Sequence, residues 1–406
     1  MNKKRWIGFT VAIILLTNVM TFYVSYKFSL ALPNGKVNIT RADYNEFKKL
    51  DKLFIVKNNL YEYYDGKIDE SVLIEGAVKG MTDSLKDPYT VYMNQKEWKD
   101  FNEQTTGEYV GLGLQVGVRD NKITVIAPFE DSPAQKAGIL PEDIIEKVNG
   151  TDVTGQDLEK AVNIMKKGKE GEKVTLTIER TGKEPFNVDV KRAKIVMVTV
   201  KGEMLEPGIG YIRLTMFDEN TAKNFNAKLK ELQGKGMKKL VLDLRGNPGG
   251  LLDQCVEVVS NFVPKDKLIV STIDKNKKEE RLDSNGGLAI GMPLVVLVDE
   301  GSASASEIVS GAIRDYKVGT LVGKKTFGKG VVQTMLYQKK YGFGDGTALK
   351  VTIARYYTPK GENIQGTGIN PDVVVEYPTA LKEKGYSRSE DPQFKKALDI
   401  IKGLQP

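Results

Sequence analysis

The hydrophobic pattern begins with a long apolar run close to the N-terminus. Residues 6–26 hold no charged side chain, and Lys3, Lys4 and Arg5 precede them. At about 1.5 Å per residue, a helix of this length crosses a hydrocarbon core of about 30 Å. Because a basic flank stays in the cytoplasm, the pattern predicts a single-pass cell-membrane protein whose remaining residues are extracytoplasmic.

A cleaved signal peptide is the alternative interpretation of residues 1–32. Ser29-Leu30-Ala31 offers a weak small-x-small cleavage site. The length of the apolar run, and Lys27 on the approach to that site, favour a retained transmembrane anchor. Cleavage would instead make the protein secreted.

Helical periodicity dominates the next region, residues 33–104. Within residues 71–85 apolar side chains recur at spacings of three and four, at Ile74, Ala77, Val78, Met81 and Leu85. This spacing places them on one face of a helix, which needs a partner from this chain or from a second copy of it. A similar face in residues 389–404, within a short helical C-terminal region at 378–406, adds to the expectation of a homodimer.

Short strands replace the helical pattern between residues 105 and 192. The expected elements are a glycine-rich turn entering a strand at 111–116, strands at 122–126, 144–150 and 174–180, and a helix at 155–165. Ser132-Pro133-Ala134-Gln135-Lys136-Ala137-Gly138 and Val148-Asn149-Gly150 lie between them. In this order the segment resembles a PDZ domain, a module that binds peptides at an open strand edge.

The resemblance implies a carboxylate-binding loop directly before the first of these strands. Backbone N–H groups of a glycine-containing loop can hold a terminal carboxylate, so Val110, Gly111, Leu112 and Gly113 are expected to bind the peptide's carboxyl terminus. The alternative is that the glycines only form a tight turn.

Strands and helices alternate from residue 193 to residue 377. Strands are expected at 210–214, 240–244 and 293–298, and the last two run into glycine-containing turns followed by helices. This order predicts an α/β core, so the whole chain is an α/β multidomain protein. Ligands of such folds bind at the carboxyl ends of the strands, where both turns lie.

Composition restricts the chemistry of any active site. The 406 residues include no histidine and one cysteine, Cys255. The absence of histidine excludes Ser-His-Asp, Cys-His and His-zinc sites, so a hydrolase built from this chain needs a carboxylate, a tyrosine or a lysine as base. Cys255 cannot form an intrachain disulfide and is expected to be buried.

Other binding functions are not favoured. The net charge of +7 comes from basic residues interspersed with acidic ones, a pattern typical of a solvated surface and not of a nucleic-acid groove. The chain has no Gly-x-x-x-x-Gly-Lys-Ser/Thr loop, so ATP independence is expected. Neither a cofactor nor a metal ion is predicted.

Three serines alternate with alanine at the start of a predicted helix, at positions 302, 304 and 306. Nothing bulky shields their hydroxyls, so one of them is a candidate nucleophile. The alternative is structural, because Ser304 and Glu307 fit the Ser-x-x-Glu capping box, in which Ser304 is only an N-cap.

Lys329 is the candidate base. It lies between Gly328 and Gly330, four residues before Gln333. If the segment is extended, positions 329, 331 and 333 point to one face, which places the amine beside the amide. Burial can lower the pKa of a lysine from about 10.4 and make the neutral base available. The alternative is an exposed lysine in a turn.

Together these residues resemble the carboxyl-terminal processing, or tail-specific, proteases of bacteria, which are Ser-Lys serine peptidases with a PDZ domain. The resemblance covers residues from about 40 to 377. Its motifs are Asp87-Pro88-Tyr89-Thr90, the PDZ order, Leu242-Asp243-Leu244-Arg245-Gly246-Asn247-Pro248-Gly249-Gly250, the serine turn at 301–308, Gly328-Lys329-Gly330, Thr358-Pro359-Lys360-Gly361 and Gly368-Ile369-Asn370-Pro371-Asp372.

The resemblance implies a role for each matching residue. Ser304 is the nucleophile, Lys329 the general base, and Gln333 the residue that positions the lysine. The backbone N–H groups of Ala305 and Gly249 form the oxyanion hole. A helix start and a glycine turn suit this task, since both present N–H groups without a shielding side chain. Asp243 and Arg245 are expected to be structural.

The implied function is a serine endopeptidase that binds exposed carboxyl termini of proteins or peptides through its PDZ domain and cleaves nearby, outside the cytoplasm. The PDZ domain, residues 105–192, is also expected to gate the peptidase core, residues 193–377. A catalytically inactive, membrane-tethered PDZ scaffold is the alternative. Acyl transfer of the penicillin-binding-protein type is not favoured, because no serine has a lysine three positions later.

Overall fold

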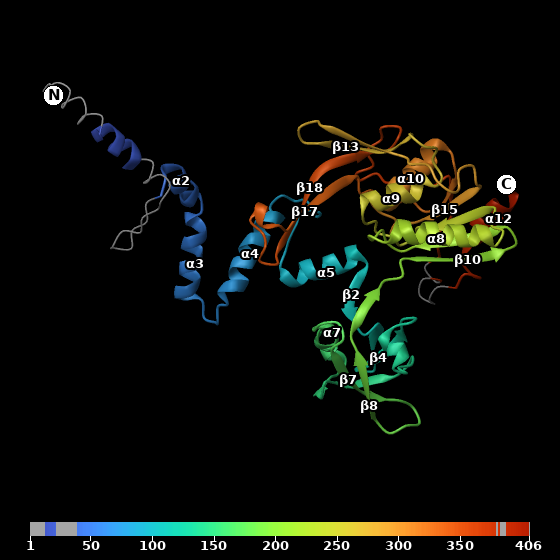
Figure 1. Ribbon diagram of the computed structural model, residues 1–406, viewed down its shortest axis with the longest axis horizontal. Coiled ribbons are helices and arrows are strands. Elements are labelled where there is room, and N and C mark those ends of the chain that lie inside the picture. The colour runs from blue at the N-terminus through green and yellow to red at the C-terminus, as the bar shows by residue number, and fades with distance from the viewer. Residues whose placement is uncertain (1–12, 22–38, 379–380, 382–386, 406) are drawn as a thin grey trace. The chain divides into compact units, whose positions relative to one another are not determined.

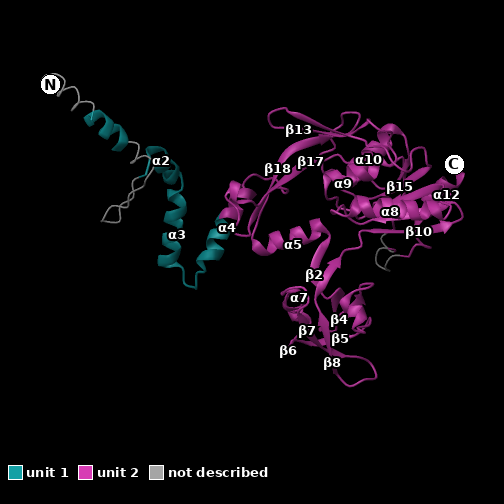
Figure 2. Cartoon of the chain, viewed as in Figure 1, with its two compact units in different colours: residues 1–77 teal, residues 78–406 magenta. Residues whose placement is uncertain are grey.

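The computed structural model describes residues 13–21, 39–378, 381 and 387–405. The chain divides into two compact units, residues 1–77 and residues 78–406 (Figure 2). The predicted transmembrane segment lies outside the described residues except for 13–21, which are helical. A search of the described residues finds no helix with the length and apolar character needed to cross a bilayer.

The described residues of the first unit are mainly helical, as the periodicity predicts. It contains α2 (Arg41–Lys49), α3 (Asp51–Tyr63) and the start of α4 (Glu70–Asp83), which runs into the second unit. Thr40 caps α2, because its hydroxyl accepts the N–H of Asp43 at 3.1 Å. Large apolar side chains on these helices are exposed, among them Phe47, Phe54 and Ile74. Because these side chains are exposed, a homodimer that covers them stays a prediction.

The second unit includes the PDZ-like segment with its own apolar core (Figure 1). Its sheet has the strand order β3-β4-β5-β7-β8, with β6 paired to β5. The segment consists of β3 (Leu114–Arg119), β4 (Lys122–Pro128), α6 (Pro133–Lys136), β5 (Ile144–Val148), β6 (Thr151–Asp152), a 3₁₀ turn (Gly155–Asp157), α7 (Leu158–Lys166), β7 (Lys173–Glu179) and β8 (Phe186–Lys191). The strand β3 is at one end of this order, so its outer edge is open for pairing.

Residues that flank this segment connect it to the rest of the unit. The flanking elements are β1 (Val91–Met93), α5 (Gln95–Thr106), β2 (Glu108–Gly111) and β9 (Ala193–Val196). β2 and β9 pair antiparallel, so the chain enters and leaves the PDZ-like sheet through one two-stranded ribbon.

A six-stranded sheet forms the centre of the α/β core, in the order β10-β11-β12-β15-β16-β19. Its elements are β10 (Val200–Glu206), β11 (Ile209–Leu214), α8 (Thr221–Gly234), β12 (Lys239–Asp243), α9 (Leu252–Ser260), β15 (Leu294–Val298), α10 (Ala305–Tyr316), β16 (Thr320–Gly323), β19 (Val373–Val374) and α12 (Pro392–Gly403). The strands β11, β12, β15, β16 and β19 run parallel, as the alternation of strands and helices predicts.

Alternation along the strands divides this core into two layers. Leu240 and Leu242 of β12 pack with α8, α9 and α10 on one face, whereas Val241 packs with α12 on the other. Cys255 of α9 is fully buried in the first layer, which confirms its predicted place, and burial raises the pKa of its thiol.

The C-terminal helix corrects one expectation. The apolar face of α12 is covered by this chain and not by a second copy of it, because Phe394 and Ile401 are buried against the chain's own sheet. That face was predicted to contribute to a homodimer, and this part of the prediction is wrong. Periodicity identified the face correctly but could not identify what covers it.

The structure contains a second, smaller sheet. Sequence analysis expected only one extended segment of it, at residues 329–333. It has the order β1-β18-β13-β14, with β17 paired to β18, and a short 3₁₀ turn at Lys339–Tyr341 follows β17. The further strands are β13 (Leu268–Asp274), β14 (Glu279–Asp283), β17 (Val331–Leu336) and β18 (Ala348–Tyr357). The long strand β18 therefore brings together segments from both ends of the unit.

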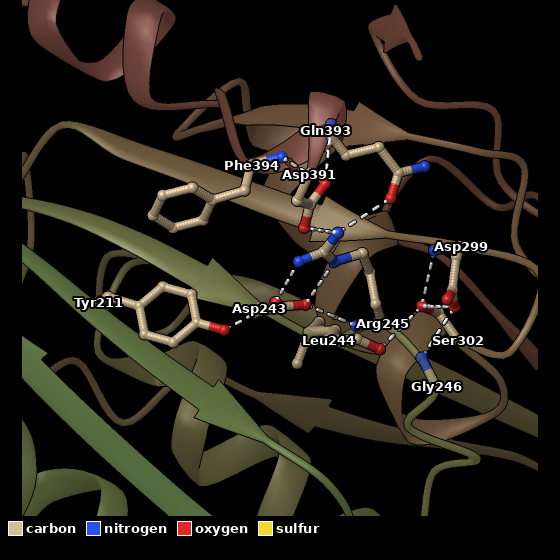
Figure 3. A network of polar contacts seen from close by, with 10 residues as sticks. All are labelled: Tyr211, Asp243, Leu244, Arg245, Gly246, Asp299, Ser302, Asp391, Gln393 and Phe394. Atoms are coloured by element: carbon tan, nitrogen blue, oxygen red, sulfur yellow. Dashed lines mark hydrogen bonds and ion pairs between the residues drawn. The ribbon is translucent and has the colours of Figure 1, made fainter. Parts of the chain in front are cut away.

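A buried polar network joins the end of β12 to the start of α12 (Figure 3). Arg245 donates to Asp243 at 3.0 and 2.7 Å, to Asp391 at 2.7 Å and to Gln393 at 3.0 Å. The hydroxyl of Tyr211 donates to Asp243 at 2.8 Å. Both carboxylates are completely buried. The network thus fixes the turn that begins at Arg245, consistent with the structural role expected for Asp243 and Arg245.

Replacing Asp391 by alanine is expected to lower the free energy of unfolding by about 3 kcal/mol or more, because a buried guanidinium loses one of its two anions and α12 loses its N-cap. Urea unfolding followed by near-UV circular dichroism measures the change. Glu231→Ala, which removes exposed ion pairs with Lys228 and Lys235, serves as the control and is expected to leave the midpoint in place. Equal midpoints for the two variants would contradict the role of Asp391.

Candidate active site

Ser304 lies in the turn between β15 and α10, at the carboxyl end of a parallel strand. It has φ +54° and ψ −113°, a conformation that a residue with a side chain rarely adopts. The hydroxyls of the two neighbouring serines already donate hydrogen bonds within the protein: Ser302 to the Leu244 carbonyl at 2.8 Å and Ser306 to the Asn247 carbonyl at 3.0 Å. Both neighbours are fully buried, whereas Ser304 is half-buried. Of the three serines, the middle one is placed to reach a substrate.

Gly249 packs directly against Ser304. A Cβ atom at position 249 would lie 2.8 Å from Ser304 Cβ and 2.7 Å from the Ala303 carbonyl oxygen, and φ of Gly249 is +102°. Only glycine fits this position. The backbone N–H of Ala303 donates to the Asn247 carbonyl at 3.0 Å, which holds the two turns together.

The two N–H groups of the predicted oxyanion hole differ in this structure. Ala305 is the first residue of α10, and within the described part of the chain its N–H has no hydrogen-bond acceptor, as expected at a helix start. The N–H of Gly249 donates instead to Asn247 Oδ1 at 2.9 Å. An oxyanion at this position would therefore have to replace the Asn247 side chain. The assignment of Gly249 stays a prediction.

Lys329 is half-buried, and its Nζ lies 4.7 Å from the centre of the Tyr89 ring. Its pKa is lowered to about 8, chiefly by burial and also by the positive charge of Lys350, while Asp87 and Glu307 act in the opposite direction. An amine with this pKa is partly neutral near pH 7. Lys329 can therefore accept a proton, as a general base must.

Glu307 joins the serine turn to the lysine segment. Its buried carboxylate accepts the backbone N–H of Ser304 at 2.9 Å and that of Lys329 at 2.8 Å. It also accepts the Gly328 N–H at 2.7 Å and the Thr326 hydroxyl at 2.6 Å. Burial raises the pKa of Glu307, and the four hydrogen bonds oppose the rise. The Ser-x-x-Glu pattern predicted only a helix cap, so sequence analysis missed that the same carboxylate also holds the lysine segment.

The strand that carries Gln333 does not extend back to the lysine. The strand β17 begins at Val331, after the lysine, and its pairing with β18 shifts register between Val332 and Gln333. The skipped residue is Ile353 of β18, so the alternation along β17 itself is continuous, and only the lysine lies before the start of the strand. The Gln333 side chain lies at the long hydrogen-bonding distance of 3.5 Å from Thr352 Oγ1. Its positioning role stays a prediction.

The predicted carboxylate-binding loop is shorter than expected. Val110 and Gly111 belong to β2 and pair with β9, and only Leu112 and Gly113 form the connection to β3. Gly113 has φ +74°, and a side chain there would collide with Ser132. The buried, tight connection fits a glycine turn, and carboxylate binding by these four residues stays a prediction.

Comparison with known families gives three matches along the chain. Residues 208–375 match peptidase family S41, residues 124–180 match a PDZ domain, and residues 15–97 match the N-terminal domain of the activating protease CtpB. The first two matches fall on the α/β core and on the PDZ-like sheet.

Similar whole proteins are carboxy-terminal processing proteases. The carboxy-terminal-processing protease of Bartonella bacilliformis is 41% identical over 86% of this chain and 80% of its own length. The carboxy-terminal processing protease CtpA of Bacillus subtilis is 38% identical over 94% of this chain and 79% of its own length.

Solved structures extend the comparison. A candidate S41 protease from Bacteroides fragilis has a TM-score of 0.55 at 18% identity, with 84% of this chain and 93% of that chain covered, and so shares the fold. The photosystem II D1 C-terminal processing protease is 30% identical over 80% of this chain and 86% of its own, with a TM-score of 0.46.

Gly249→Ala is expected to abolish peptidase activity, because the added methyl group collides with Ser304 Cβ and the Ala303 carbonyl. Gly246→Ala is the matched control in the same turn. Position 246 has φ +66° but open space around a Cβ, so this variant incurs only a backbone cost of about 1 kcal/mol. Cleavage of a peptide by each folded variant, checked by circular dichroism, measures the difference. An active Gly249→Ala enzyme would contradict the packing of these two turns.

Proposed function

Because this chain belongs to the carboxy-terminal processing proteases of peptidase family S41, serine-type peptidases, we propose that it cleaves protein substrates near their carboxyl termini by a Ser304–Lys329 mechanism. The observation that carries the proposal is the bridge through Glu307, whose carboxylate binds the backbone of both residues. The lowered pKa of Lys329 supports its part as the base.

The first half of the reaction forms an acyl-enzyme. Neutral Lys329 takes the proton from the Ser304 hydroxyl while Oγ attacks the scissile carbonyl carbon. The oxyanion that forms is stabilised by the N–H groups of Ala305 and Gly249, the latter after exchanging its bond to Asn247. The C–N bond then breaks, the Lys329 ammonium gives its proton to the leaving amine, and an ester on Ser304 remains.

Hydrolysis of the ester completes the cycle. A water molecule gives a proton to Lys329 and attacks the ester carbonyl, and the Ser304 oxygen leaves with that proton. The products are a new carboxylate on one peptide and a free amine on the other. Gln333 is proposed to orient the lysine amine, which requires its side chain to leave Thr352.

Substrate recognition is assigned to the PDZ-like segment. The edge strand β3 offers backbone groups to an extended peptide, and the residues that precede it, Val110 to Gly113, are proposed to bind the terminal carboxylate. A peptide-binding module in the same chain as a reactive serine can also control when the serine cleaves. We include in the proposal that the segment gates the peptidase core.

The site of action is proposed from the N-terminal sequence. The uncharged run at residues 6–26 behind a basic flank favours a membrane anchor with the peptidase outside the cytoplasm. If the segment is cleaved, the enzyme is secreted. Either location matches an enzyme that acts on proteins without ATP.

Ser304→Ala is expected to abolish peptide cleavage while peptide binding persists, because only the nucleophilic oxygen is lost. Mass spectrometry of a peptide digest measures cleavage, and fluorescence anisotropy of a peptide with a free carboxyl terminus measures binding. Ser310→Ala, whose hydroxyl only bonds back to the Ser306 carbonyl in the same helix, is the control and should cleave normally. Cleavage by Ser304→Ala, or failure of a fluorophosphonate to label Ser304 in the unmodified enzyme, would refute the mechanism.

The pH profile should follow the lysine. Because the base is active when neutral, kcat/KM is expected to rise about tenfold per pH unit below pH 8 and to level off above it. With no histidine in the chain, no step near pH 6.5 is expected from the enzyme. Initial rates between pH 5.5 and about 9.5 measure the profile, and a rate that is flat across this range would contradict Lys329 as the base.

A further inference from the structure

The turn Asp87-Pro88-Tyr89-Thr90 lies beside the proposed base, and no step of the proposed mechanism uses it. The Asp87 carboxylate shapes the turn by accepting the Tyr89 N–H at 3.0 Å and the Thr90 hydroxyl at 2.6 Å. The Thr90 N–H donates to the Asp87 carbonyl at 3.2 Å, which closes a β-turn. Its conformation is therefore fixed by its own first residue.

The turn is also fixed to the second sheet. The buried Thr90 hydroxyl accepts the N–H of Thr352 in β18 at 3.1 Å. The strand β1 follows at once and pairs with β18 from Val91↔Lys350 to Met93↔Ala348. Since β18 also pairs with β17, which begins two residues after Lys329, the turn and the lysine are held by the same strand.

Two side chains of the turn act on the lysine amine. The Tyr89 ring lies 4.7 Å from Lys329 Nζ, a distance at which an aromatic face stabilises an ammonium ion. Burial raises the pKa of Asp87, but hydrogen bonds from Thr90, Thr352 and the Tyr89 backbone, together with the charge of Lys329, lower it below its usual value. Asp87 is therefore an anion whose charge favours the ammonium form of Lys329.

The charged groups that face Lys329 come from three elements. Asp87 of the turn and Glu307 of α10 favour its ammonium form, and Lys350 of β18 disfavours it. Glu307 is bound to the backbone of both catalytic segments, so its removal would disturb the site as a whole. Asp87 is the anion whose charge can be removed with the turn kept in place.

We propose, on the basis of the Ser-Lys mechanism above, that Asp87 and Tyr89 are positioning residues for the general base: the ring seats the Lys329 ammonium and the carboxylate balances its charge. The turn thereby sets the pH at which the amine becomes a base, and it returns the amine to one place after each proton transfer. Neither residue needs to touch the substrate.

The experiment compares pH profiles of kcat/KM for charge-removing variants. In Asp87→Asn the rising limb is expected to move to lower pH by about half a unit or more, which raises the neutral fraction of the amine at pH 6.5 about threefold. Because the amine is then a weaker base, the plateau falls, and the rate at pH 6.5 rises by less than this factor. Lys350→Met is expected to move the limb to higher pH. Asp274→Asn is the matched control, since Asp274 shares a pocket of about 480 Å³ with Asp87 but does not act on Lys329.

Tyr89 provides a second measurement that leaves Asp87 intact. Tyr89→Leu removes the aromatic face and is expected to move the rising limb of kcat/KM to lower pH, as Asp87→Asn does. Tyr89→Phe keeps the face and is expected to have the pH profile of the unmodified enzyme. If Asp87→Asn does not fold, the two Tyr89 variants decide the question.

The outcomes distinguish a failure of the positioning role from a failure of the Ser304–Lys329 mechanism. Unmoved limbs in Asp87→Asn and Tyr89→Leu, in an enzyme whose Ser304→Ala variant is inactive, would overturn the positioning role alone. Shifts of the same size and direction in Asp274→Asn would also overturn it, because the effect would then be one of general surface charge. A Ser304→Ala variant that still cleaves would instead refute the Ser-Lys mechanism.

Discussion

One buried carboxylate holds the two segments of the proposed active site together. Glu307 satisfies donors from the serine turn and from the segment of Lys329, and both its oxygens are used. Burying a carboxylate is costly unless several donors surround it, and here the donors come from two segments about twenty residues apart. The folded state therefore favours the one arrangement in which both segments meet at this side chain. Serine and lysine acquire their positions from the backbone that Glu307 binds.

The site lies where two sheets meet. The parallel strands β12 and β15 are neighbours, so their carboxyl ends bring the Gly249 turn against the Ser304 turn. The lysine lies just before β17 of the other sheet, and Tyr356 of β18 connects that sheet to the serine turn through a hydrogen bond of 3.3 Å from its hydroxyl to the Ser304 carbonyl. The network around Arg245 fixes the first residue of the glycine turn (Figure 3).

Sequence patterns predicted the local elements well. Regular spacing identified α8, α9 and β15, because their apolar positions repeat with the period of a helix or form a continuous buried run. The motifs also led to Ser304 and Lys329. The antiparallel sheet around β18 was largely missed, since β13 and β14 are paired through contacts between residues far apart in the sequence. The second role of Glu307 was missed for the same reason, because it depends on partners that local spacing does not contain.

The depressed proton affinity of Lys329 distinguishes it as a chemical target from an exposed lysine of ordinary pKa. With a pKa of about 8, roughly a tenth of the Lys329 amines are uncharged at pH 7, against fewer than about one in a thousand for a lysine of ordinary pKa. An uncharged amine is a nucleophile in its own right. Acylating reagents, aldehydes and dissolved carbon dioxide should therefore react at Lys329 in preference to a lysine of ordinary pKa. Under the proposed mechanism, a covalent modification of this amine would abolish activity and leave Ser304 unmodified.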